Sequence, residues 1–381
     1  MHHANDTPRL VYVINVDWYF KLHWLNRATA AQTRGFKVYL LTSFVTKGIK
    51  EDLESLGFIC VHVKLSRSGM NIIHELQTAA WIYQNLKAIG PTIVHTITVK
   101  PNIYAGIAAN LLAIPAIKSI TGLGLVFSSQ TFFFRLFRPL IISLYRLTGM
   151  GNQGAFVFEN TDNKIIFQKR RIGKKQLLIH IPGAGVDTGQ FAFSPKPLNH
   201  HLKILFAARL LKDKGLDTLI EAVSRFKSQG LKCDLLVAGI FDPAAKNTYS
   251  PAEIKSLVSK RKIQWLGRVD DMPSLLKRVD VVVLPTRYGE GIPRILIEAG
   301  AVGRLVITTN ISGCKELIHH NENGLLVEPN DSKELSSKLI AIAQNPTDYL
   351  RLVENLHKKI LKCYSDETVI SHFLALYKTW C

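Results

Sequence analysis

The sequence predicts an α/β protein with two Rossmann-like, doubly wound domains. Strand-like apolar runs alternate with helix-like segments, and this pattern stops near residues 194–201 and then restarts. Strands that alternate with helices indicate parallel sheets covered on both faces. A length of 381 residues also suits two domains better than one core.

The elements follow in order along the chain. In the first half, strands are expected at 10–16, 36–44, 91–98 and 115–121, and helices at 24–35, 74–90 and 103–114. In the second half, strands are expected at 203–210, 233–240, 262–267, 279–286, 304–310 and 324–331, and helices at 215–230, 272–279 and 292–303. A last helix at 366–381 places Val369, Phe373, Leu376 and Tyr377 on one face. The predicted domains are 1–195 and 196–362, followed by a C-terminal helical segment, 363–381.

Composition and charge narrow the class of protein. A hydrophobic content of 47% with 20% charged residues is typical of a globular chain. The net charge of +19 attracts polyanions, which include nucleic acid, anionic lipid and phosphorylated ligands. The basic residues are spread along the chain without an RNP, KH or zinc-finger pattern, so we expect no nucleic acid partner.

The cysteines and the apolar runs indicate the cellular compartment in which the protein is expected. Five scattered cysteines without a CxxC pair argue against a disulfide framework or a zinc site and fit a reducing compartment. The N-terminus lacks the apolar core of a signal peptide, and no uncharged apolar run is long enough to predict a transmembrane helix.

Two carboxylates flank a loop-to-helix junction in the stretch GEGIPRILIEAG, residues 289–300. Pro293 suits the first turn of a helix, which places Glu290 at the helix start and Glu298 roughly 12 Å further along the same side. Such a pair can span an elongated ligand, and the helix N-terminus with Gly291 can donate N–H groups to an anion between them. Hydroxyls on both sides of a phosphate describe a nucleotide sugar. The alternative is that Glu298 is a helix-surface residue and Glu290 a capping residue.

Five stretches of the second half carry a resemblance. They are AARLLKDKGLDTLIEA (207–222), LLVAG (235–239), WLGRVDDMPSLLKRVDVVVLP (265–285), IPGAGVD (181–187) and the segment 287–331 around the two carboxylates. In order and spacing they resemble the donor-binding core of family 4 retaining glycosyltransferases, which have the GT-B fold. That fold has two Rossmann-like domains that face a cleft and a C-terminal helix that crosses back to the first domain.

The resemblance implies roles for individual residues. Arg209 and Lys214 would bind the donor diphosphate and, with Glu290, form the catalytic set. Glu290 would contact the transferred sugar and Glu298 the ribose. The backbone from Gly267 to Val269 would hold the base, and Gly291 and Ile292 would also belong to the donor-binding set. Two fixed cations can stabilise a departing nucleoside diphosphate without a metal. The chain has no Asp-x-Asp motif, so we expect no metal and no cofactor, with a UDP-sugar as donor substrate. The alternative for both cations is a solvated strand exit.

The first half resembles a narrower group within this family. VINVDWYFKLHWLNRA (13–28), RSGMNIIHELQ (67–77), IVHTITVKPNIYAGIAA (93–109) and SITGLGLVFS (119–128) are similar to bacterial enzymes that build surface polysaccharides such as O-antigen, lipopolysaccharide and capsule, or protein glycans. Those enzymes extend saccharides on undecaprenyl diphosphate at the cytoplasmic face of the membrane, many with UDP-N-acetylhexosamines or UDP-hexoses. The resemblance therefore implies a cytoplasmic enzyme, peripheral on the inner face of the bacterial membrane.

Four residues of the first half are candidates for acceptor binding. His95 and Lys100 flank the end of the strand 91–98, and Asp17 and His23 lie in the first strand-to-helix connection. The alternative for His95 is a histidine satisfied locally at a strand end. Some family members carry a histidine where this chain has Thr121 and Gly122, so no general base is evident there. The resemblance implies a front-face route in which the departing phosphate takes the acceptor proton.

The segment 128–149 mixes Phe, Leu and Ile with three arginines, Arg135, Arg138 and Arg146. The arginines argue against a transmembrane span and favour a segment in the plane of anionic headgroups, with a break or kink at Pro139. The alternative is an ordinary buried helix pair. The leading function is sugar transfer to a lipid-linked acceptor. A glycosyltransferase with a soluble acceptor, a nucleic-acid-binding protein and a sugar-nucleotide epimerase are the competing readings.

Overall fold

The computed structural model describes residues 7–65, 71–123, 132–151, 153–198, 200–242, 245, 247–289 and 291–381, without the side chains of 132–134. The chain forms two compact units. One comprises Met1–Ala184 with Glu367–Cys381, and the other comprises Gly185–Asp366. The chain thus leaves the first unit before the expected boundary at 195 and returns to it within the expected C-terminal segment.

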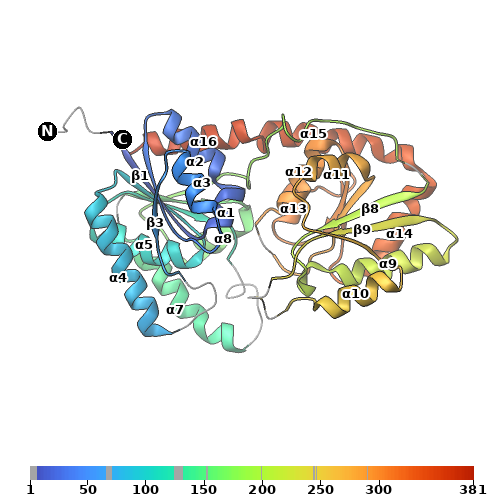
Figure 1. Cartoon of the computed structure of the whole chain (residues 1–381), viewed down its shortest axis with the longest axis horizontal. Coiled ribbons are helices and arrows are strands. Elements are labelled where there is room, and N and C mark those ends of the chain that lie inside the picture. The colour runs from blue at the N-terminus through green and yellow to red at the C-terminus, as the bar shows by residue number, and fades with distance from the viewer. Residues whose placement is uncertain are drawn as a thin grey trace. The chain divides into compact units, whose positions relative to one another are not determined.

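The first unit is a seven-stranded parallel sheet in the order β3-β2-β1-β4-β5-β6-β7 (Figure 1). Its strands are β1 (Arg9–Val16), β2 (Lys37–Ser43), β3 (Ile59–His62), β4 (Ile93–Ile97), β5 (Ala116–Ile120), β6 (Gly154–Phe158) and β7 (Leu177–His180). Alternate residues of a strand face opposite sides: Tyr12 belongs to one apolar cluster, and Val11 and Val13 to another. The sheet is therefore buried on both faces, as parallel sheets require.

Helices cover both faces of this first sheet. They are α1 (Asp17–His23), α2 (Leu25–Thr33), α3 (Ile49–Ser55), α4 (Ile72–Ile89), α5 (Val99–Leu111), α7 (Phe132–Thr148), α8 (Thr161–Lys169) and α16 (Asp366–Lys378). Apolar residues of α1, α2, α3 and α16 share one cluster with the sheet, whereas α4, α5 and α7 pack on the opposite face. The C-terminal helix thus packs in the first unit, as expected (Figure 1).

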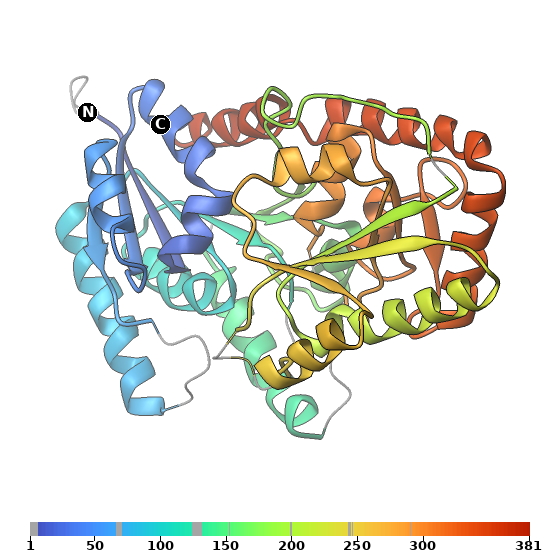
Figure 2. The ribbon, with the colours of Figure 1, turned by 45° about the vertical axis from the view of Figure 1, so that its right-hand side comes forward.

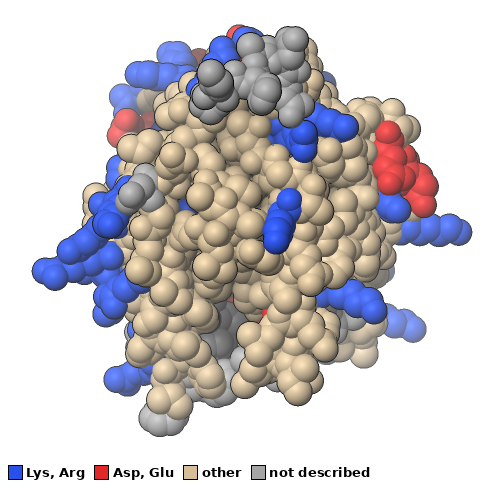
Figure 3. Space-filling view, turned by 90° about the vertical axis from the view of Figure 1, so that its left-hand side faces the viewer, with Lys and Arg blue, Asp and Glu red and all other residues tan. Residues whose placement is uncertain are grey.

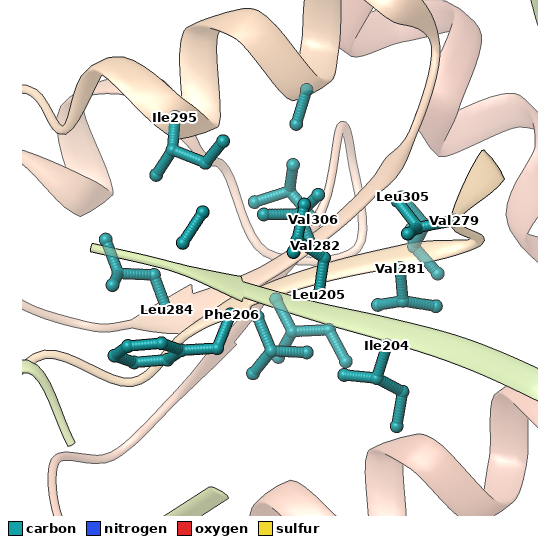
Figure 4. Close-up of a cluster of buried hydrophobic side chains, with 14 of the residues drawn as sticks. Ile204, Leu205, Phe206, Val279, Val281, Val282, Leu284, Ile295, Leu305 and Val306 are labelled. Carbon is teal, nitrogen blue, oxygen red and sulfur yellow. The ribbon is translucent and has the colours of Figure 1, made fainter. Parts of the chain in front are cut away.

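The second unit is a six-stranded parallel sheet in the order β10-β9-β8-β11-β12-β13. Its strands are β8 (Leu202–Ala207), β9 (Cys233–Ala238), β10 (Gln264–Gly267), β11 (Val281–Leu284), β12 (Leu305–Thr309) and β13 (Leu325–Val327). Figure 4 shows Leu205, Val282 and Val306 from three strands of this sheet in its buried apolar cluster. The sequence-predicted strands of this half are confirmed.

The helices of the second unit complete its two outer layers (Figure 2). They are α9 (Leu216–Ser228), α10 (Pro251–Ser259), α11 (Met272–Arg278), α12 (Arg294–Val302), α13 (Cys314–Leu317), α14 (Ser332–Gln344) and α15 (Leu350–Cys363), with short 3-10 helices at Lys212–Lys214 and Pro346–Tyr349. The helix α10 begins with a capping box between Ser250 and Glu253, which satisfies its free N–H groups.

Both sheets have a switch point where the strand order reverses. It lies between β1 and β4 in the first sheet and between β8 and β11 in the second. Open α/β sheets bind ligands outside the carboxyl ends of their strands at this point. The connections after these four strands are therefore the places to look for a site.

Helix α7 runs without interruption through Pro139, so the break expected there is wrong. Ile142 and Tyr145 pack into the core, whereas Leu136 and Leu140 are exposed. This apolar packing holds the helix although the proline nitrogen cannot donate the usual hydrogen bond. In the described part of the chain, no helix is both long enough and apolar enough to cross a membrane.

Candidate functional site

Arg209 and Lys214 lie in the connection that follows the central strand β8. The guanidinium of Arg209 lies 2.6 Å from the carboxylate of Asp242, which follows β9 and is buried. Lys214 ends the 3-10 helix, its side chain is buried, and its ammonium lies 5.4 Å from the ring centre of Tyr288, which follows β11. The structure thus places the two predicted cations at the switch point of the second sheet.

Two glycines hold these connections against one another. A Cβ on Gly215 would lie 2.0 Å from the carbonyl oxygen of Pro285, and a Cβ on Gly239 would lie 2.0 Å from that of Ala208. Gly215 also has φ +79°, a left-handed conformation that favours glycine. Only glycine allows the backbone to pass so closely, which places the connection after β8 beside those after β9 and β11.

The connection after β11 leads into α12. Pro293 is the N-cap of this helix, and Gly291 and Ile292 are buried just before it. Glu290, the first of the two predicted carboxylates, lies outside the described residues. Tyr288, two residues earlier in the chain, is described, and its ring lies over the Lys214 ammonium.

Glu298 lies on α12 and is almost completely buried. Its carboxylate is 2.6 Å from the guanidinium of Arg294, one turn earlier on the same helix. Burial raises the pKa of Glu298 above its usual range, and Arg294 opposes that shift. The alternative of a helix-surface carboxylate is therefore wrong, because the residue is buried and has a cationic neighbour.

Gly267 ends β10 and Val269 follows it, two strands away from β8. The carbonyl oxygen of Gly267 accepts a 2.8 Å hydrogen bond from the backbone N–H of Gly239. Gly267 has φ +65°. This bond ties the predicted base-binding backbone to the connection after β9, which also carries Asp242.

This part of the second unit brings together groups suited to a nucleotide sugar. The cations Arg209 and Lys214 lie at the switch point, and the buried carboxylate of Glu298 lies on α12, the helix that follows β11. Cations at this edge can hold phosphate oxygens, and carboxylates accept hydrogen bonds from hydroxyls. No group of three or more metal-ligating side chains occurs among the described residues.

Asp17 performs a structural role in the first unit. It is fully buried at the end of β1 and accepts hydrogen bonds from the backbone N–H groups of Trp18, Val45 and Thr46 and from the Thr46 hydroxyl. These bonds connect α1 with the chain that follows β2. The geometry therefore does not favour Asp17 as an acceptor ligand.

His95 is also buried in the first unit, with no exposed surface. Its Nδ1 lies 2.7 Å from the hydroxyl of Tyr377 on α16, and its Nε2 lies 2.8 Å from the hydroxyl of Ser119. Burial lowers the pKa of His95 well below its usual range, and nearby Arg27 adds to this effect. Both ring nitrogens are occupied, so the geometry favours the alternative of a locally satisfied histidine.

Lys100 forms an ion pair in the first turn of α5. Its ammonium lies 2.6 Å from one carboxylate oxygen of Glu75 on α4, and the Tyr104 hydroxyl donates to the other at 2.6 Å. Thr98 connects β4 to α5 and has φ +75°, which is unusual for threonine. This strained junction lies beside the switch point of the first sheet, where strain often accompanies function.

His23 ends α1 and packs its ring 4.4 Å from that of Tyr19. The structure thus does not bring the four predicted acceptor residues together. Asp17 and His95 lie in the interior, whereas Lys100 and His23 are partly exposed on separate helices. Their roles in acceptor binding stay predictions.

Sequence reasoning missed two charged residues of the candidate donor site. Asp242 orients Arg209, and Arg294 pairs with Glu298. Asp242 follows the predicted strand 233–240, and that position is the signal that could have identified it. Arg294 stands four residues before Glu298, the spacing of neighbours on a helix face.

Two family models match the chain. The model for "Glycosyl transferases group 1" covers residues 190–359, and the model for "Glycosyl transferase 4-like" covers residues 9–148. The first includes every described residue of the candidate donor site, and the second lies within the first unit.

Two curated relatives are similar over most of their length. N,N'-diacetylbacillosaminyl-diphospho-undecaprenol alpha-1,3-N-acetylgalactosaminyltransferase of Campylobacter jejuni is 26% identical over 341 residues, which are 86% of this chain and 87% of the relative. UDP-Gal:alpha-D-GlcNAc-diphosphoundecaprenol alpha-1,3-galactosyltransferase of Escherichia coli is 24% identical over 288 residues, 73% of each chain.

Solved structures have the same fold. HepE of Anabaena in complex with UDP superposes with a TM-score of 0.77 at 16% identity, over 97% of this chain and 100% of HepE. Sucrose-phosphate synthase of Thermosynechococcus elongatus gives 0.73 at 18% identity, over 97% of this chain and 98% of the synthase. These likenesses show the GT-B fold.

Proposed function

We propose that this chain, a member of the glycosyltransferases described by the group 1 and 4-like models, is a sugar-transferring enzyme. It transfers a sugar from a UDP-sugar to a saccharide on undecaprenyl diphosphate. The observation that carries the proposal is the position of Arg209 and Lys214 at the switch point of the second sheet. The names of the two relatives support the lipid-linked acceptor. The UDP in the HepE complex supports the donor.

The donor site works by electrostatic stabilisation. As the bond to the sugar breaks, negative charge builds up on the departing UDP, and cations fixed beforehand favour that charge. Asp242 orients Arg209 through a 2.6 Å ion pair, and Tyr288 lies over the Lys214 ammonium. In this proposal, Glu298 accepts hydrogen bonds from the ribose, and the chain segment that includes Glu290, Gly291 and Ile292 contacts the sugar.

Retention of the anomeric configuration and independence from metal ions are parts of this proposal. Both follow from the family resemblance, together with two cations that can serve the departing diphosphate. The proton of the acceptor hydroxyl then goes to the departing phosphate, which gains a basic oxygen as its bond to the sugar breaks.

We further propose that the first unit lies on an anionic membrane surface at the inner face of the bacterial membrane. The N-terminal halves of α4 and α7 expose Ile72, Ile73, Leu136 and Leu140. Both helices lie on one face of the sheet and follow parallel strands, so their N-termini lie at its carboxyl edge. Exposed apolar side chains beside arginines suit the headgroup region.

Charge supports the same surface. Arg135 is exposed on α7 beside these apolar residues, and Arg138 is partly exposed. More generally, the face of the molecule drawn in Figure 3 carries lysine and arginine side chains among uncharged ones, with few acidic residues. Anionic lipid attracts such basic groups by about 1 kcal/mol each near the surface.

The experiment that tests the transfer is a donor screen. Purified protein in detergent is incubated with UDP-, GDP- and ADP-sugars, and released nucleotide is measured with and without an N-acetylhexosaminyl-diphosphoundecaprenol acceptor. We expect release from one UDP-sugar, increased by the lipid-linked acceptor. Transfer to a free saccharide at the same efficiency would support a soluble acceptor instead, and release from GDP- or ADP-sugars alone would overturn the proposed donor.

A further inference from the structure

Glu159 is a carboxylate for which the proposed reaction has no role so far. It follows Phe158, the last residue of β6, and so stands at the carboxyl edge of the first sheet, between the ends of β5 and β7. Its side chain is partly exposed. Within the described chain no hydrogen bond or ion pair joins its carboxyl group to another residue.

Hydrogen bonds fix the backbone on both sides of Glu159. Asn160, the next residue, is buried and caps α8 by accepting a hydrogen bond from the N–H of Asn163 at 2.9 Å. The carbonyl oxygen of Phe158 accepts a bond from the N–H of Ile181 at 3.0 Å. The backbone that carries the carboxyl group is thus fixed on both sides.

Arg27 supplies the positive charge that acts on Glu159. Arg27 is buried on α2, and its guanidinium lies 4.3 Å from the ring centre of Trp24 and 5.1 Å from that of Phe373. Burial raises the pKa of Glu159 to about 7, and Arg27 opposes that shift. The adjacent strand β7 ends in His180, in register with Phe158.

A partly buried carboxylate without hydrogen-bond donors from the protein is unfavourable, unless a ligand supplies them. In the proposed function the first unit binds the acceptor saccharide, so a ligand at the carboxyl edge of its sheet would supply sugar hydroxyl groups as hydrogen-bond donors. We infer that Glu159 is an acceptor-binding residue whose carboxylate receives a hydrogen bond from a hydroxyl group of the acceptor saccharide. This inference rests on the proposed function and assigns to that site a residue of the first unit.

The test compares Glu159→Gln with Glu51→Gln, which changes an exposed carboxylate on α3. The acceptor is N-acetylglucosaminyl-diphosphoundecaprenol, or the lipid-linked saccharide that the donor screen selects. Loss of a hydrogen bond to a charged group predicts an acceptor KM about tenfold higher for Glu159→Gln, with unchanged UDP binding. Glu51→Gln serves as the reference with unchanged values.

A pH series separates binding from a structural role. For the wild type, the acceptor KM should rise as the pH falls from 8 to 6, because the carboxylate becomes protonated; for Glu159→Gln it should stay level. If Glu159→Gln does not fold, Glu159→Asp keeps the charge, moves it back by one methylene and should still raise the acceptor KM. Acceptor KM values and pH profiles like the wild type's would overturn the inference. A wild type that transfers nothing to any lipid-linked saccharide would instead overturn the proposed function.

Discussion

His95 and Tyr377 lie 282 residues apart in the chain, yet their side chains meet in the core of the first unit at 2.7 Å. The Tyr377 hydroxyl also lies 2.7 Å from that of Tyr12 on β1, and His95 continues the chain of bonds to Ser119 on β5. A buried polar chain of this kind connects the C-terminal helix to three strands. Helix α16 is therefore part of the first unit's core.

Tyr377→Phe should destabilise the first unit. The substitution removes one hydroxyl and leaves His95 and Tyr12 with unsatisfied buried groups, which costs about 1–3 kcal/mol. The expected result is a melting temperature several degrees lower in a thermal shift measurement. Tyr349→Phe is the control, because this tyrosine is in the second unit and its hydroxyl makes no hydrogen bond in the described chain. Equal melting temperatures for both variants would show that the buried chain adds no stability.

Arg209→Ala and Lys214→Ala should each lower kcat by roughly a hundredfold, because each removes a cation from beside the developing charge of UDP. The matched control is Lys212→Ala on the same 3-10 helix, where the lysine is exposed and pairs with Glu253 at 3.1 Å. The measurement is UDP release at saturating donor and acceptor. Turnover near that of the wild type in either site variant would contradict the proposed role of that cation.

Glu298→Gln should weaken UDP binding by about tenfold, measured by titration calorimetry, since the amide loses the charge that strengthens hydrogen bonds from the ribose. Glu221→Gln is the control, because Glu221 also pairs with an arginine one turn away on its helix, yet is exposed. An unchanged dissociation constant for Glu298→Gln would contradict the proposed bond to the ribose and would mean that the carboxylate only pairs with Arg294.

Sequence patterns predicted those parts of the candidate donor site whose position depends only on neighbouring elements in the chain. Arg209 and Lys214 follow a strand directly, so their position at the sheet edge could be read from the chain. His95 was placed at the acceptor edge because it lies in a strand, but the pattern cannot show the Tyr377 hydroxyl that occupies its Nδ1. The pattern likewise cannot show the hydrogen bonds that Asp17 accepts from Val45 and Thr46, which belong to another connection. Contacts between distant segments decide whether a polar residue is free for a ligand.

Lys118 predicts how stability changes with pH. This residue of β5 is fully buried over the ring of Phe156, and burial lowers its pKa to about 7. In the unfolded chain a lysine has a pKa of about 10.4, so between these values the unfolded state binds more protons and stability rises with pH. The slope from this residue is at most about 1.4 kcal/mol per pH unit.

Lys118→Met should therefore raise the melting temperature more at pH 7 than at pH 9.5. The exposed Lys87→Met is the control and should give nearly equal changes at both values. A gain for Lys118→Met that does not depend on pH would show that the lysine is charged in the folded protein as well.

The proposed membrane surface predicts binding to anionic vesicles. Leu136→Ser with Leu140→Ser removes two exposed apolar side chains of α7 and leaves its arginines in place. Each buried leucine contributes about 1.5–3 kcal/mol, so co-sedimentation with phosphatidylglycerol vesicles should fall at least tenfold. The control is Leu361→Ser, an exposed leucine of α15 in the second unit. Equal co-sedimentation of both variants would place the membrane contact elsewhere, whereas binding that salt abolishes in every variant would reduce it to charge alone.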